Sequence, residues 1–188
     1  MAAWARWLLR CAGWRVQGTA PHVPRCVVVF APHTSNWDFP LLLLTRSALG
    51  LRSSYLGKHT LFRPPFGWLF RTLGGIPVNR SDAHHLVAQI SHEFQAREHL
   101  WLAMAPEGTR KKTDHWKSGF YWIALAARVP VLLSYIDSQR RHCGIGPLIE
   151  LTGDVERDLA VIREFYADKH GLNPELAGDV RFKSTAHP

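Results

Sequence analysis

Short runs of β-branched and apolar residues alternate with longer segments of helical periodicity along most of this 188-residue chain. The clearest run, residues 25–31, is rich in valine and uncharged after its first residue, which predicts a strand buried on both faces. Such alternation favours an α/β fold, with a mostly parallel or mixed sheet flanked by helices. In this fold class, functional side chains are expected beyond the carboxyl ends of the strands.

The remaining elements follow the same alternation, with glycine and proline marking most of the boundaries. We expect the tail from Gly171 onward to be peripheral. The expected strands are residues 25–31, 53–57, 76–78, 100–105, 130–136 and 143–151, and the expected helices are residues 3–15, 39–49, 66–73, 81–97, 119–127 and 155–170.

The first expected helix is amphipathic, because its apolar residues recur at helical spacing and arginines flank them. Tryptophan beside arginine suits a helix that lies in the lipid headgroup region, and packing on the protein's own core is the alternative. We therefore predict two parts: an interfacial helix in residues 1–17 and a single α/β domain in residues 18–188. The apolar stripe is Trp4, Trp7, Leu8 and Cys11, flanked by Arg6, Arg10 and Arg15.

Composition limits the partners and the compartment. The net charge of +8 and the pI of about 9.9 indicate an anionic partner, which could be nucleic acid, a membrane surface or a phosphorylated small molecule. No nucleic-acid-binding signature occurs, so nucleic acid is not an expected partner. Three widely spaced cysteines favour a reducing compartment, and without a zinc-ligand spacing we expect no metal. With no apolar stretch of about eighteen residues, we expect a cytoplasmic protein, peripheral at the inner face of the membrane.

One histidine and one aspartate, His33 and Asp38, lie in the segment between the apolar runs 27–30 and 39–44. The intervening residues favour turns and caps, which places His33 in a loop after a strand and Asp38 at a helix start. A carboxylate beside an imidazole fixes its tautomer and offsets the charge of the imidazolium, as a general base requires. A capping histidine and a helix-start aspartate would leave the same pattern, so the pair alone does not decide.

Two further loops combine glycine with arginine at expected strand ends. In residues 74–80, the guanidinium of Arg80 could clamp a phosphate, with Lys58 adding positive charge nearby. The alternative for both is an ordinary surface cation.

The loop that follows residues 100–105 contains an acid, a glycine, a hydroxyl and a base in succession. Arg110 could hold phosphate, and Glu107 could hold a hydroxyl or orient Arg110. Gly108 permits close backbone approach to a ligand, with Thr109 beside it. An exposed turn with a local ion pair is the alternative.

Taken together, these segments resemble the sequence blocks of the glycerolipid acyltransferase family, which includes lysophosphatidate and glycerol-3-phosphate acyltransferases. Four blocks occur in the expected order: His33-x4-Asp38, residues 74–80, residues 107–110 and residues 129–131. The segments Leu61-Phe62 and Phe66-Gly67-Trp68 before the second block look similar as well.

The resemblance implies an enzyme of phospholipid biosynthesis that moves a fatty acyl group from acyl-CoA or an acyl carrier protein to a lysophospholipid-like acceptor. The leading acceptor is 1-acyl-glycerol-3-phosphate. His33 would be the general base and Asp38 its partner, with no acyl-enzyme and no cofactor beyond the thioester co-substrate. The implied acceptor-site residues are Arg80, Glu107, Gly108, Thr109, Arg110 and Lys58.

The chain departs from the family pattern in ways that bear on the acceptor. Asn79 stands where the family often has an acid, and the last block continues as Leu132-Leu133-Ser134, where a second proline is commonly seen. The chain is also short for the family. An amino-acid-derived lipid or a glycolipid is therefore an alternative acceptor, and a non-catalytic lipid- or membrane-binding module is an alternative function.

Overall fold

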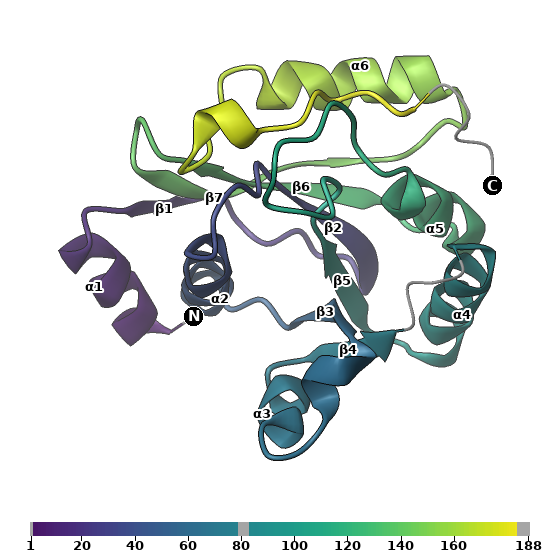
Figure 1. Ribbon diagram of the computed structural model, residues 1–188, viewed down its shortest axis with the longest axis horizontal. Coiled ribbons are helices and arrows are strands. Elements are labelled where there is room, and N and C mark those ends of the chain that lie inside the picture. The colour runs from purple at the N-terminus through teal and green to yellow at the C-terminus, as the bar shows by residue number, and fades with distance from the viewer. Residues whose placement is uncertain (1, 79–82, 184–188) are drawn as a thin grey trace.

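A mixed sheet forms the centre of the fold in the computed structural model, which describes residues 2–78 and 83–183 (Figure 1). The strand order is β1-β7-β6-β2-β5-β3-β4, and only the β6–β7 pair is antiparallel. The expected α/β class is confirmed. The strands are β1 (Arg15–Gln17), β2 (Arg25–Ala31), β3 (Ser53–Lys58), β4 (Gly75–Val78), β5 (Leu100–Met104), β6 (Val131–Asp137) and β7 (His142–Ile149).

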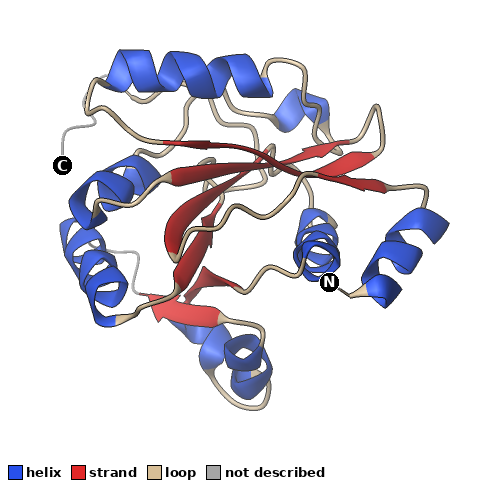
Figure 2. Cartoon of the chain, turned by 180° about the vertical axis from the view of Figure 1, so that it is seen from behind, coloured by secondary structure: helices blue, strands red, loops and turns tan. Residues whose placement is uncertain are grey.

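Helices cover both faces of this sheet (Figure 2). Alternate residues of β2 point to opposite faces, so Val27 and Val29 pack with α4, α5 and α6, whereas Phe30 packs with α1 and α2. Short 3-10 turns occur at His59–Phe62 and Pro174–Leu176. The helices are α1 (Ala3–Cys11), α2 (Asp38–Leu49), α3 (Gly67–Thr72), α4 (Ala83–Ala96), α5 (Gly119–Ala127) and α6 (Val155–Tyr166).

The registers of the central strands bring two loops to one edge of the sheet. β2 pairs in parallel with β5 and β6, and Val29 lies opposite Met104 on one side and Leu133 on the other. The loops that leave β2 and β5 therefore emerge side by side, as expected for parallel strands.

The first helix is shorter than predicted. The expected helix over residues 3–15 ends at Cys11, because Gly13 adopts a left-handed conformation (φ 79°) and the N–H of Trp14 closes the turn on the carbonyl of Leu9 at 2.7 Å. Residues 15–17 then form β1, which pairs in parallel with β7. This strand was not predicted from the sequence, because three residues are too few to show a period.

The C-terminal tail was expected to be peripheral, and most of its described residues, 171–183, are exposed or half-buried, but Gly171 and Asn173 are bonded to earlier segments. The backbone N–H of Asn173 donates to Thr34 Oγ1 at 3.0 Å, and its side-chain Nδ2 donates to the Thr34 carbonyl at 2.9 Å. Ser138 Oγ donates to the carbonyl of Gly171 at 2.6 Å, and both Gly171 and Thr34 are buried. The tail therefore crosses the loop that follows β2 and is bonded to it.

The cysteines provide a chemical test of this packing. Cys11 is exposed, whereas Cys26 and Cys143 are buried in the sheet, where burial raises the pKa of the Cys26 thiol to about 12. A buried, protonated thiol is a poor nucleophile, so we expect iodoacetamide to label Cys11 alone in the folded protein. Mass spectrometry would locate the label. In a Cys11→Ser variant no rapid labelling should remain, and rapid labelling of Cys26 would contradict the fold.

Candidate active site

The predicted histidine–aspartate pair is assembled at the junction between β2 and α2. His33 lies in the loop after β2 and Asp38 is the first residue of α2, as the turn-rich sequence between them predicted. His33 Nδ1 is 3.1 Å from Asp38 Oδ2. The His33 side chain is 18% exposed and the Asp38 side chain is fully buried, so the aspartate lies behind the ring, away from solvent.

The Asp38 carboxylate is held by its own loop. Oδ2 accepts hydrogen bonds from the backbone N–H groups of Thr34 at 2.7 Å and Ser35 at 2.8 Å, in addition to its contact with the imidazole. Oδ1 is buried and has no hydrogen-bond partner among the described residues. One carboxylate oxygen thus fixes the loop and the ring together, and Nε2 is the His33 nitrogen left for other chemistry.

Glu107 holds the same loop from the neighbouring strand. Its Oε2 accepts the backbone N–H of His33 at 3.0 Å, and the backbone N–H of Gly178 in the tail lies near enough to act on the pKa of the carboxyl. The residue is 2% exposed. Burial raises the pKa of the Glu107 carboxyl, and the two N–H donors oppose that rise. From the sequence, Glu107 was expected to hold an acceptor hydroxyl or to orient Arg110, whereas in the structure its carboxylate supports the histidine loop and does not line the cavity.

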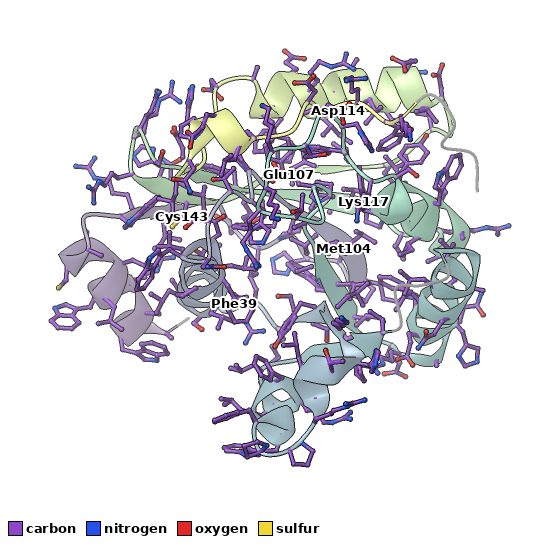
Figure 3. All side chains as sticks on the ribbon, in the orientation of Figure 1. Phe39, Met104, Glu107, Asp114, Lys117 and Cys143 are labelled. Atoms are coloured by element: carbon purple, nitrogen blue, oxygen red, sulfur yellow. The ribbon has the colours of Figure 1, made fainter. Side chains whose placement is uncertain are left out.

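A cavity of about 930 Å³ opens beside His33, beyond the carboxyl ends of the central strands. Most of its wall is apolar, and three cations, Arg110, Lys117 and Lys183, also line it. Figure 3 labels Met104 at the end of β5, with Lys117, Glu107 and Phe39 around it. Apolar side chains in the wall include Phe39, Leu42, Leu86, Met104, Phe120 and Ile123.

The loop after β5 has the geometry expected of a close-approach turn. Gly108 adopts φ 64°, and a β-carbon there would lie 2.8 Å from Lys117 Cδ, so the lysine side chain lies directly over the glycine. Thr109 Oγ1 accepts the N–H of Lys111 at 3.1 Å. Arg110 is exposed at the cavity, and within residues 2–78 and 83–183 it has no acidic partner.

Of the other predicted binding residues, Lys58 lies away from the cavity and Arg80 is not among the described residues. Lys58 ends β3 and is exposed, but it does not line the cavity wall. Arg80 lies outside the described residues, as does Asn79. Three residues of the tail near the site, Asn173, Gly178 and Lys183, were not predicted from the sequence. No motif marks them, because their contacts are made across the fold.

Comparisons with known proteins agree with this arrangement. The Acyltransferase family model matches residues 15–136, which is more than half of the chain and contains both the histidine–aspartate loop and the loop after β5. No curated protein sequence matches the chain.

Among solved structures, the chain resembles the crystal structure of PlsC from Thermotoga maritima, a 1-acyl-sn-glycerophosphate acyltransferase. The TM-score is 0.60 at 20% sequence identity, and the match covers 87% of this chain and 73% of that one. At this identity the likeness shows a shared fold. Since the family model covers most of the described site, the chain belongs to the acyltransferase family.

Proposed function

We propose that this acyltransferase moves a fatty acyl group from a thioester donor to a hydroxyl of a lysophospholipid-like acceptor, with 1-acyl-glycerol-3-phosphate as the leading candidate. The observation that carries the proposal is the His33 imidazole, which lies 3.1 Å from a buried carboxylate at an apolar cavity that also exposes cations. An acyl chain suits the apolar wall, and a phosphate suits the cations.

In this mechanism, Nε2 of His33 removes the proton from the acceptor hydroxyl as the oxygen attacks the thioester carbonyl. The tetrahedral intermediate collapses by breaking the carbon–sulfur bond, and the imidazolium returns its proton to the leaving thiolate. The products are an ester and a free thiol. Asp38 fixes the ring through Nδ1 and stabilises the imidazolium. No acyl-enzyme forms.

We assign the acceptor's phosphate to Arg110, with Lys117 and Lys183 beside it, because all three line the same cavity. Gly108 and Thr109 shape that loop. Glu107 acts as a positioning residue through the N–H of His33. Arg80 and Lys58 stay sequence-based predictions of further phosphate contacts.

The donor is acyl-CoA, with an acyl carrier protein as a second candidate, and no other cofactor is proposed. We also propose that the protein is peripheral at the inner face of the membrane. The side chains of Trp4 and Trp7 on α1 are exposed on the protein surface, and tryptophan favours the membrane interface. No helix in the described parts of the chain is long and apolar enough to cross a membrane.

Release of free thiol tests the reaction directly. Purified protein with palmitoyl-CoA and lysophosphatidate should release thiol only when both substrates are present, and mass spectrometry should detect phosphatidate. An acceptor panel with amino-acid-derived lipids and glycolipids would test the alternative acceptors. Absence of turnover with every acceptor, with both CoA and carrier-protein donors, would overturn the proposal.

The phosphate assignment predicts a selective defect in an Arg110→Ala variant. Loss of a charge-assisted hydrogen bond should raise the KM for lysophosphatidate about 10- to 100-fold with little change in kcat, because Arg110 would bind the phosphate and not the reacting hydroxyl. With monoacylglycerol, which lacks the phosphate, any turnover should be unchanged. Arg157→Ala, at an exposed position on α6, is the matched control. An unchanged KM for lysophosphatidate in the Arg110 variant would place the phosphate elsewhere.

A further inference from the structure

All of the net positive charge belongs to the first 78 residues. This part of the chain contains nine arginine and lysine residues and one acidic residue, Asp38, whereas the remaining 110 residues contain fourteen basic and fourteen acidic residues. Asp38 is fully buried. The surface formed by residues 2–78 therefore carries basic side chains and no acidic ones.

Exposed apolar side chains gather on the same part of the molecule. Among the described residues, eight of the nine large apolar side chains that are exposed belong to residues 2–78, and the exception is Val161 on α6. Three lie on α1, one precedes α2, and four lie in the segment 59–72 that contains α3. These side chains are Trp4, Trp7, Leu8, Trp37, Leu61, Phe66, Trp68 and Leu69.

Two of these groups flank one helix. The C-terminal half of α2 contacts the start of α1, where the Ala2 N–H donates to the Ser47 carbonyl at 3.0 Å, and the end of α3, where Arg46 Nη1 donates to the Leu73 carbonyl at 2.8 Å. Figures 1 and 2 both show α1 and α3 on the side of the sheet away from α6. We call this surface the α1–α3 face.

We infer that the α1–α3 face docks on an anionic phospholipid bilayer, with α1 and the segment 59–72 as two separate contacts. Aromatic side chains favour the membrane interface, and arginines such as Arg10 and Arg63 attract anionic headgroups. An acidic protein surface would complement the arginines as well, but four of the eight exposed apolar side chains are tryptophans, a residue type that is enriched at membrane–water interfaces.

This inference rests on the proposed function, which takes the acceptor from the membrane. It adds the segment 59–72 as a second membrane contact, and it orients the cavity relative to the bilayer. The cavity wall includes Phe39 and Leu42 of α2 and Tyr55 of β3. Tyr55 packs against Phe39 and donates its hydroxyl to the carbonyl of Phe70 in α3. Docking of the α1–α3 face would therefore bring this side of the cavity close to the lipid surface.

Vesicle flotation with the full chain tests the second contact. Wild-type protein should float with phosphatidylcholine vesicles that contain phosphatidylglycerol, and much less with phosphatidylcholine alone. A Phe66→Ser/Trp68→Ser variant, with α1 intact, should bind the anionic vesicles about tenfold more weakly. Val161→Ser removes an exposed apolar side chain from α6 and should bind like wild type. The substituted side chains are exposed, so melting temperatures should not change.

Three outcomes would overturn the inference: wild-type binding by the α3 variant, equal binding to neutral and anionic vesicles, or a change of oligomeric state in the α3 variant without loss of vesicle binding. Thiol release with a short-chain, monomerically dissolved acceptor separates this inference from the proposed function. The α3 variant should retain full turnover in that assay. If the wild type itself shows no turnover, the proposed function fails while the flotation result still stands.

Discussion

Replacing His33 with alanine is expected to abolish acyl transfer while the fold stays intact. The imidazole would supply general-base catalysis, which typically contributes about 10²–10⁴-fold, and no other base lies in the loop after β2. The backbone N–H of His33 would still donate to Glu107, and the Thr34 and Ser35 N–H groups would still donate to Asp38. The loop should therefore keep its path, and the defect should fall on kcat.

The measurement is kcat for thiol release at saturating palmitoyl-CoA and lysophosphatidate, compared with the thermal unfolding midpoint. His92→Ala on α4 removes an exposed imidazole of the same size and should leave both quantities unchanged. If the His33 variant kept most of its kcat, another group would have to accept the proton.

The sequence predicted the parts of this site that depend on local chemistry. The valine run of β2 and the turn residues after it placed His33 in a loop and Asp38 at a helix start, and both placements are observed. An apolar run indicates a buried strand, and turn residues indicate the backbone conformation of a loop. Both features can therefore be predicted from one short segment.

The contacts that join segments far apart in the chain could not be predicted in this way. Glu107 was expected to hold an acceptor hydroxyl or to orient Arg110, but its carboxylate turns inward and accepts the backbone N–H of His33. Asn173 lies in a stretch that resembles an ordinary polar tail, yet it bonds Thr34 twice. A hydrogen bond to a distant backbone group leaves no periodic trace in the sequence, so only the fold reveals it.

The two oxygens of Asp38 allow its charge to be tested separately from its geometry. In an Asp38→Asn variant, the two backbone N–H donors should direct the amide oxygen to the Oδ2 position, and the amide nitrogen should take the position of Oδ1, which has no partner among the described residues. The oxygen could then still accept from His33 Nδ1, so the tautomer should be kept. Only the negative charge that stabilises the imidazolium would be lost.

We therefore expect the Asp38→Asn variant to lose about 10²-fold in kcat, less than the roughly 10⁴-fold that the corresponding change causes in a serine protease, where the wrong tautomer is stabilised. KM should change little.

Asp38→Ala is the contrasting variant, because it leaves the Thr34 and Ser35 N–H groups without their acceptor, at a cost of about 1–3 kcal/mol each in stability. Denaturant unfolding and steady-state kinetics on both variants separate the two effects. Full activity of the Asp38→Asn variant would show that the negative charge of Asp38 is not needed for catalysis. If the Asp38→Asn variant were as unstable as the Asp38→Ala variant, the role of Asp38 would be to stabilise the loop.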